Sequence, residues 1–385
     1  MRRLPSSPPA LSPRLSPPRR VPTQTKQPPH PRIESLPEHK PLNQTNPLLP
    51  GVTLQNTKTS QPPPPPPLSP PRSPPPPSPQ PPSPPVKLTK QYWLPAASSS
   101  DGKKLVAGVY QGNLYTSNNS GVDWTVCLGA GLREWVLVTS SNNGNKLVAA
   151  VNNGYIYTST DSGVNWVERT DAGFSASTSL SSSSSGNVLV AGSNDGSVFT
   201  SSDSGVSWTA RMTDKAKTET AAAISGDGKT IVVGRYGDHI YTSSDSGVHW
   251  TAQVNSSIGD WYSVAASSNG AKLVASTYEG DLYTSSDSGV TWTVTGVGLS
   301  TSSDGTGQWQ SIAISDDGSK ICAGVDQGYL YTSTDSGYSW MISGDLGSWQ
   351  TIGMSGDGTK IIATNDIYIY LSKDSGKTWR ISSPT

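Results

Sequence analysis

The chain has 385 residues and a formal net charge of zero at pH 7, and this balance conceals two unlike parts. Residues 1–92 hold 12 basic and two acidic side chains, a net charge of +10, whereas residues 93–385 hold 16 basic and 26 acidic side chains, a net charge of −10. No run of about 20 apolar residues is present, so we expect no membrane span. The acidic body disfavours nucleic acid as a partner. Two cysteines and four scattered histidines predict no disulfide framework, no metal site and no bound cofactor.

Residues 1–92 form a basic, proline-rich arm. Of the 33 prolines, 31 precede residue 86, and apolar residues are scarce, a composition that predicts disorder. The tract 61–85 is expected to be an extended polyproline II spacer. An Arg-rich, acid-free beginning favours a plastid, whereas the Ser-Pro tract and the sequons at Asn43, Asn118 and Asn255 favour an extracellular or cell-wall location. No secretory signal peptide is visible after Met1.

From residue 93 onward the chain is built from one repeated unit. The pattern Ser/Thr-x-Asp-x-Gly-x-x-Trp, which we call the box, recurs at 42-residue intervals over the first five copies and then at intervals of 48 and 39. A period of about 40–45 residues is typical of the four-stranded blades of β-propellers. The box tryptophans are Trp124, Trp166, Trp208, Trp250, Trp292, Trp340 and Trp379.

Each unit divides into four short runs of β-branched and aromatic residues separated by Asx-Gly turns. In the fifth unit these runs are 261–267, 271–277, 281–285 and 292–295. The sequence therefore predicts an all-β fold, a seven-bladed β-propeller with four-stranded antiparallel blades over 93–385, preceded by the disordered Pro-rich arm of residues 1–92. No sign of a blade shared between the two ends is seen. We place the blades at about 93–128, 129–170, 171–212, 213–254, 255–298, 299–343 and 344–383.

The box is expected to be structural. A short carboxylate can accept hydrogen bonds from nearby backbone N–H groups, Gly allows a positive φ, and the Trp covers the turn. The first copy has Asn where the others have Asp, so we expect a weaker turn there and expect Asn119→Asp to be neutral or stabilising. The positions assigned to this structural role are Asn119, Asp161, Asp203, Asp245, Asp287, Asp335 and Asp374.

The pattern resembles the Asp-box, or BNR repeat, of sialidase-type propellers. In that family the turn joins the third and fourth strands of a blade, on the face away from the binding site. The longer consensus over 309–320 and 323–340 is also similar to propellers related to photosystem II stability and assembly factors, which are non-catalytic and chaperone-like. Xyloglucan-type hydrolases carry the box as well, and they use two carboxylates across a cleft between two propellers.

The resemblance places a binding site on the face opposite the boxes. The loops between the second and third strands gather there, and they vary between blades while their flanks hardly change. An aromatic residue also begins most inner strands, and it serves either interblade packing or an aromatic rim at the channel mouth. The predicted binding residues are Tyr110, Asn152, Asp195, Tyr236, Tyr278, Glu279 and Asp326 from the loops, with Trp135, Trp261, Trp309 and Trp349 from the rim.

These features favour a non-catalytic binding propeller for a protein or glycan partner, acting as a monomer. An assembly-factor-like chaperone of a plastid is the alternative in the same class, and a glycan hydrolase is the alternative in another. A hydrolase could draw a carboxylate pair from Asp195, Glu279 and Asp326. The body has only five arginines and lacks the arginine cluster that sialidases need. We therefore predict no catalytic residue.

Overall fold

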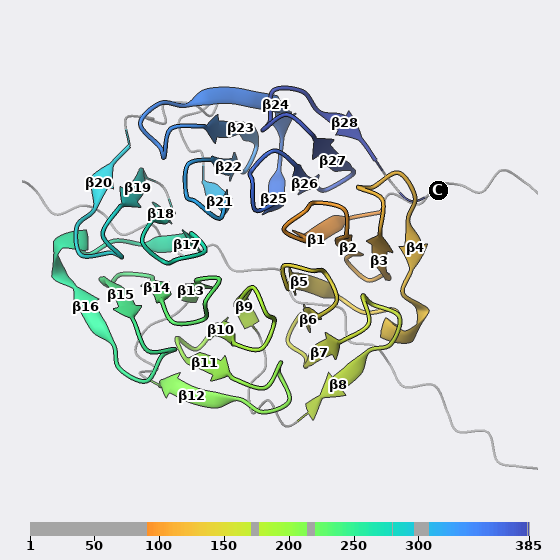
Figure 1. Cartoon of the computed structure of the whole chain (residues 1–385), viewed down its shortest axis with the longest axis horizontal. Coiled ribbons are helices and arrows are strands. Elements are labelled where there is room, and N and C mark those ends of the chain that lie inside the picture. The colour runs from red at the N-terminus through yellow and green to blue at the C-terminus, as the bar shows by residue number, and fades with distance from the viewer. Residues whose placement is uncertain are drawn as a thin grey trace, which may run out of the picture. The chain divides into compact units, whose positions relative to one another are not determined.

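The computed structural model describes residues 91–170, 177–213, 220–278, 280–295, 308–382 and 384. The predicted arm, apart from residues 91 and 92, and Glu279 lie outside this part. From residue 93 onward, seven four-stranded antiparallel sheets surround a central axis as blades (Figure 1). Each sheet is built from four consecutive strands in up-and-down order. The prediction of an all-β, seven-bladed propeller is confirmed.

The strands follow the predicted runs closely in every blade. The longest is the outer strand of blade six, which continues past the predicted boundary at residue 343 and ends just before blade seven begins. In order, four to a blade, they are β1 (Trp93–Ser98), β2 (Leu105–Val109), β3 (Leu114–Ser117), β4 (Thr125–Val126); β5 (Trp135–Ser140), β6 (Leu147–Val151), β7 (Ile156–Ser159), β8 (Val167–Arg169); β9 (Ser177–Ser182), β10 (Leu189–Ser193), β11 (Val198–Ser201), β12 (Thr209–Met212); β13 (Thr220–Ile224), β14 (Ile231–Arg235), β15 (Ile240–Ser243), β16 (Thr251–Gln253); β17 (Trp261–Ala266), β18 (Leu273–Thr277), β19 (Leu282–Ser285), β20 (Thr293–Val294); β21 (Trp309–Ile314), β22 (Ile321–Val325), β23 (Gly328–Ser333), β24 (Met341–Gly347); β25 (Trp349–Met354), β26 (Ile361–Asn365), β27 (Ile369–Ser372) and β28 (Arg380–Ile381). Two 3-10 helices, η1 (Leu128–Ala130) and η3 (Val254–Ser256), lie in the connections after blades one and four.

This hairpin order gives the propeller two unlike faces. The turn between strands one and two of a blade, which we call the first turn, and the box between strands three and four lie on one face, the box face. The loop between strands two and three and the connections between blades lie on the other, the loop face. The inner strands therefore begin at the loop face and end at the box face.

The core lies between the blades. In five of the seven blades a tryptophan begins the inner strand and is 0–1% exposed: Trp93, Trp135, Trp261, Trp309 and Trp349. The cluster around Trp309, for example, joins Ala265 and Leu282 of blade five to Ile321 of blade six. Each tryptophan thus fills a junction, which is the interblade packing that the sequence offered as one explanation of the inner aromatic residues.

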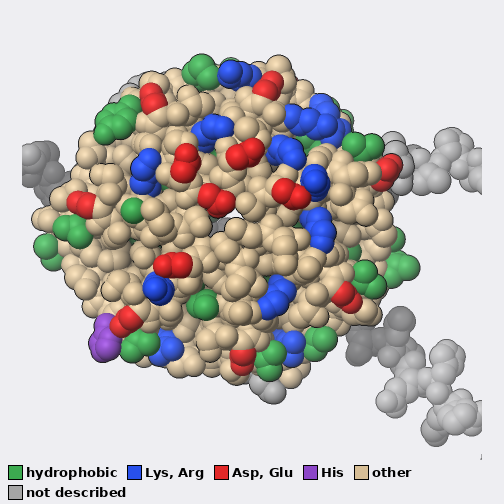
Figure 2. All heavy atoms as spheres, in the orientation of Figure 1, with side chains coloured by type: hydrophobic (Ala, Val, Ile, Leu, Met, Phe, Trp, Pro, Cys, Tyr) green, Lys and Arg blue, Asp and Glu red, His purple; other side chains and the backbone are tan. Residues whose placement is uncertain are grey.

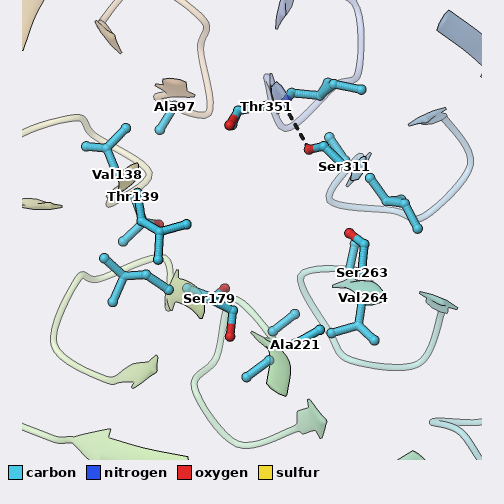
Figure 3. Close-up of a pocket in the computed structure, with 18 of the residues that line it drawn as sticks. Ala97, Val138, Thr139, Ser179, Ala221, Ser263, Val264, Ser311 and Thr351 are labelled. Atoms are coloured by element: carbon cyan, nitrogen blue, oxygen red, sulfur yellow. Dashed lines mark hydrogen bonds between the residues drawn. The ribbon is translucent and has the colours of Figure 1, made fainter. Parts of the chain in front are cut away.

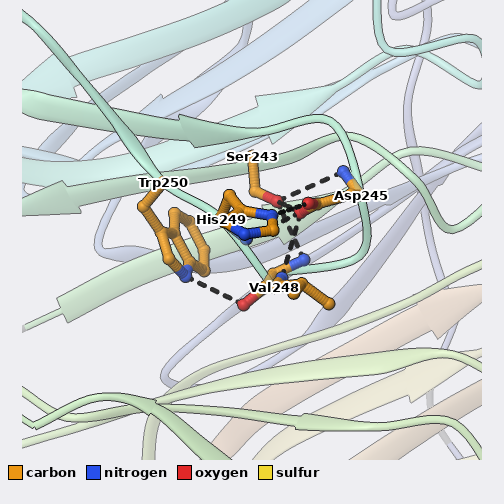
Figure 4. Close-up of polar contacts among 6 residues, drawn as sticks. Ser243, Asp245, Val248, His249 and Trp250 are labelled. Atoms are coloured by element: carbon orange, nitrogen blue, oxygen red, sulfur yellow. Dashed lines mark hydrogen bonds and ion pairs between the residues drawn. The ribbon is translucent and has the colours of Figure 1, made fainter.

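The fourth box shows how the repeated turn is held (Figure 4). Asp245 Oδ1 accepts the Ser243 hydroxyl at 2.8 Å and the backbone N–H groups of Val248 and His249 at 3.0 and 2.9 Å. Asp245 Oδ2 lies 2.6 Å from His249 Nδ1, and Trp250 Nε1 donates to the Gly247 carbonyl at 3.0 Å. These bonds, first the backbone bond and then the side-chain bond from His249, hold the pKa of Asp245 well below its ordinary value.

Two consecutive residues of each box have a positive φ, and the sequence indicated only one of them. In the fourth box Gly247 has φ +86° and the preceding Ser246 has φ +60°. The left-handed serine recurs in all seven boxes, at 120, 162, 204, 246, 288, 336 and 375. A left-handed conformation is uncommon for a residue with a side chain, so the hydrogen bonds to the carboxylate must hold it there.

The first box reaches the same geometry with its two polar residues exchanged. Asn119 Oδ1 accepts the N–H groups of Val122 and Asp123 at 3.1 and 2.9 Å, and Asn119 Nδ2 donates to Asp123 Oδ2 at 2.7 Å. In the second box Asn165 Nδ2 donates to Asp161 Oδ2 at the same distance of 2.7 Å. The asparagine and the aspartate have changed places, so the first box keeps every bond of this network and is no weaker in its number of contacts.

The ring closes without a shared blade. One backbone hydrogen bond at each junction links neighbouring first turns into a collar round the axis. The last bond runs from Gly356 of blade seven to Ser100 of blade one, so the two end blades are joined like any other pair. In order the bonds, each written from the N–H donor to the carbonyl acceptor, are Ser100–Asn142 at 2.8 Å, Asn142–Ser184 at 2.9 Å, Ser184–Gly226 at 2.8 Å, Asp227–Ser268 at 3.3 Å, Ser268–Asp316 at 2.9 Å, Asp316–Gly356 at 2.8 Å and Gly356–Ser100 at 2.8 Å.

Candidate functional site

A channel of about 730 Å³ runs along the axis, and it is lined by the inner strands of all seven blades (Figure 3). Its wall is made of Ser, Thr, Ala, Val, Leu and Ile side chains, with Asn, Gln and one Tyr added. None of the described residues in the wall carries a charge at neutral pH. The channel is therefore a polar but uncharged cavity, and an ion entering it would lose hydration without gaining a counter-charge.

On the box face the side chains are occupied by bonds within the protein. Lysines of the first turns reach across junctions: Lys104 Nζ donates to Ser162 Oγ at 3.0 Å, and Lys272 Nζ donates to Ser336 Oγ at 2.9 Å. Lys320 Nζ donates to the Asp357 carbonyl at 2.7 Å in the same way. In Figure 2 such basic side chains alternate with acidic ones around the central hole. This face is used chiefly to hold neighbouring blades together.

The rim of the channel at the loop face is formed by the residues that follow the inner tryptophans. Because side chains alternate along a strand, a residue next to a buried tryptophan points toward the axis. At this position blades five, six and seven carry Tyr262, Gln310 and Gln350, whereas blades one and two carry Leu94 and Val136. The rim is thus aromatic and amide-bearing over three consecutive blades and aliphatic on the opposite side.

The polar half of the rim is ordered by side-chain contacts. The Tyr262 hydroxyl donates to Gln310 Oε1 at 3.0 Å, and its ring lies 5.4 Å from the ring of Tyr278. Gln350 Nε2 donates to Asp366 Oδ1 at 3.1 Å. Residues of three blades therefore meet around one part of the mouth, and the predicted Tyr278 is among them.

A second cluster joins blades one and two on the same face. Glu134 accepts hydrogen bonds from Gln111 Nε2 at 3.0 Å and from Asn152 Nδ2 at 3.1 Å. Bonds from Gln111, Asn152 and Tyr110, in that order, lower the pKa of Glu134 below its ordinary value. Two of the predicted residues, Tyr110 and Asn152, thus meet through a carboxylate that the sequence did not single out.

The remaining predicted residues are spread around the loop face. Tyr236 is 40% exposed, Asp195 is exposed and Asp326 is half-buried. The four predicted rim tryptophans, Trp135, Trp261, Trp309 and Trp349, are buried in the junctions, so none of them offers a ring face to a ligand in this structure. Asp195 and Asp326 belong to blades three and six, which are not neighbours. The proposed carboxylate pair is therefore not formed by adjacent loops.

Sequence reasoning missed Glu134, Tyr262, Gln310 and Gln350. The last three had a signal: once the inner aromatic residue is assigned to a blade junction, strand alternation puts the next side chain in the channel. No group of His, Cys, Asp or Glu able to hold a metal ion occurs in the part of the chain that the structure describes. Over the same ranges, no helix has the length and apolar character needed to cross a membrane.

Comparison with solved structures supports the fold, whereas no protein-family model and no curated protein matches the chain. The GH74 xyloglucanase from Xanthomonas campestris matches with a TM-score of 0.62 and 14% identity over 76% of this chain. The match takes in 55% of that enzyme, so the chain spans about half its length. YCF48 from Cyanidioschyzon merolae matches with a TM-score of 0.56 and 14% identity, covering 76% of this chain and 98% of its own.

A structure of YCF48 bound to D1 peptide matches with a TM-score of 0.55 and 16% identity, covering 74% of this chain and 94% of its own. These neighbours belong to the two groups of propeller that the sequence indicated, the assembly-factor propellers and the xyloglucan-type hydrolases. At such low identity the likeness is one of fold.

Proposed function

We propose that this protein is a non-catalytic binding propeller whose loop face engages a polypeptide partner. The observation that carries the proposal is the unequal use of the two faces. The box face repeats the same turns and interblade bonds around the ring, whereas the loop face presents a different side chain from each blade. A surface that varies on a constant frame is how binding sites are usually built on rigid scaffolds.

The aromatic residues of the loop face suit a protein partner. Tyr110, Tyr236 and Tyr278 are all half-buried or exposed, and tyrosine gives a large contact area with few rotatable bonds. A solved complex of a propeller with a similar fold, YCF48, holds D1 peptide, which supports a peptide as a ligand for this architecture. A glycan hydrolase is less well supported, because the channel wall is uncharged and the predicted carboxylates lie on separate blades.

Selection from a random dodecapeptide library with the immobilised full-length protein tests the proposal. The affinity of an enriched peptide is then measured by fluorescence anisotropy. A triple variant, Tyr110→Ala, Tyr236→Ala and Tyr278→Ala, should keep its melting temperature and weaken binding by at least about tenfold.

The matched control lies on the box face. Val164, Val248 and Val290 occupy equivalent, exposed positions in three boxes, and their joint replacement by Ala should leave the affinity unchanged. Loss of binding in the valine variant, with binding retained in the tyrosine variant, would place the site on the wrong face. Release of reducing sugar from xyloglucan, abolished by Asp326→Asn, would identify a hydrolase instead.

A further inference from the structure

Two glutamines occupy the same position in neighbouring blades. Gln310 is the second residue of β21 and Gln350 is the second residue of β25, and both line the channel at the loop face. Both are half-buried. Their side chains therefore stand side by side across the junction of blades six and seven, at the entrance to an uncharged cavity.

The two amide groups are oriented in opposite senses by their neighbours. Gln310 accepts the Tyr262 hydroxyl on its Oε1 atom at 3.0 Å, which leaves its two Nε2–H donors with no partner among the described residues. Gln350 donates from its Nε2 atom to Asp366 Oδ1 at 3.1 Å, which leaves its Oε1 acceptor without a partner in the same part of the chain. Tyr262 and Asp366 thus fix which end of each amide faces the mouth.

A fixed donor beside a fixed acceptor is the complement of a peptide group. A peptide carbonyl can accept from Gln310 Nε2, and a peptide N–H of the same segment can donate to Gln350 Oε1. A sugar would gain most from an open aromatic face, but Tyr262 and Tyr278 pack against each other and each spends one side of its ring. The neutral channel wall behind the glutamines disfavours charged side chains.

We propose that Gln310 and Gln350 bind the main chain of an extended, uncharged polypeptide segment at the mouth of the channel. This inference rests on the proposed function and adds the residues and the chemistry of recognition. The pair reads a peptide group and not a particular side chain, so it fixes the position of the segment while the tyrosines of the loop face contact its side chains.

The experiment uses the full-length protein and a peptide from the library selection, together with a series of its analogues in which one peptide N–H at a time is replaced by an ester oxygen. One ester position should weaken binding to the wild type by about two- to tenfold, the loss expected for one hydrogen bond. The same ester should cause no further loss in Gln350→Met. Gln310→Met should weaken binding of every analogue by a similar factor.

Gln327→Met is the matched control, because Gln327 lies in a loop on the same face and outside the channel wall. It should change neither the affinity nor the ester profile. If the peptide binds but both glutamine variants keep wild-type affinity, this inference fails and the proposed function stands. If no peptide is enriched, or if a xyloglucan oligosaccharide binds and depends on both glutamines, both proposals fail.

Discussion

Replacing Asn119 by Asp in the first box is the sharpest test of how the box works. The change makes this box match the other six in sequence, and the sequence alone predicts a neutral or stabilising effect. In the structure, however, Asn119 Nδ2 donates to Asp123 Oδ2 at 2.7 Å. A carboxylate at position 119 would lose this bond and would face a second carboxylate. We therefore expect Asn119→Asp to destabilise the protein.

The magnitude follows from two effects. Two like charges about 4 Å apart repel by about 1 kcal/mol in water, and the lost hydrogen bond adds about 0.5–1.5 kcal/mol. The new carboxylate recovers part of this cost, because it accepts the N–H groups of Val122 and Asp123 more strongly than the amide oxygen does. The net loss should be about 1 kcal/mol, or about 2 °C in melting temperature for a domain of this size.

A double-mutant cycle isolates the interaction. The variant Asn119→Asp with Asp123→Asn recreates the arrangement of Asp161 and Asn165 in the second box, so it should regain wild-type stability. Urea unfolding followed by tryptophan fluorescence at pH 7 should give a coupling energy of about 1 kcal/mol. The deficit of the single variant should also shrink at 0.5 M NaCl, because salt screens exposed charges.

Equal stability of Asn119→Asp and the wild type, with no coupling in the cycle, would refute this reasoning. It would mean that the backbone N–H bonds alone determine the strength of the turn. The contact between the fourth and eighth residues of the pattern region, on which the argument depends, would then contribute nothing measurable.

Three further predictions concern stability. Trp261→Ala should lower the free energy of unfolding by about 3–5 kcal/mol, and Trp292→Ala should cost less, because Trp261 is 1% exposed whereas Trp292 is only half-buried; equal losses in urea unfolding would contradict this. The carboxyls of Asp317 and Asp335 accept serine hydroxyls that hold each pKa at about 2. Since the unfolded carboxyls titrate near 3.9, this stabilisation is complete above about pH 4 and is lost as the pH falls toward 2, so thermal melts should show a decline over that interval, and a flat profile would argue against it. A chain that begins at Lys87 should melt at the same temperature as the full-length protein, and aggregation of that chain would show that the propeller needs the arm.

The sequence was sufficient for the architecture because the signals of a blade are local. Strand alternation, Asx-Gly turns and the box tryptophan all act within about 40 residues, and the repeat reports them seven times. The box hydrogen bonds also span only a few residues, so the structural role of Asp245 could be derived from the residue types alone.

The site was predicted less completely because it depends on how blades meet. Trp309 could have faced the channel or the junction, and only the assembled ring determines that it is buried and that Gln310 faces the axis. The cluster around Glu134 likewise joins two blades. The exchange of Asn119 and Asp123 was visible in the sequence, but its meaning requires knowing that these two side chains touch.

The collar of backbone bonds also bears on how the order of the blades is encoded. Every junction uses the same main-chain contact, and the bond from Gly356 to Ser100 is as short as the others, at 2.8 Å. Such a contact does not distinguish one neighbour from another, so the covalent connections alone determine which blade follows which. A circularly permuted gene that joins blade seven to blade one by a peptide linker, and opens the chain between blades two and three, should therefore yield the same ring. The propeller would then tolerate rearrangement of its gene at blade boundaries far better than insertion within a blade.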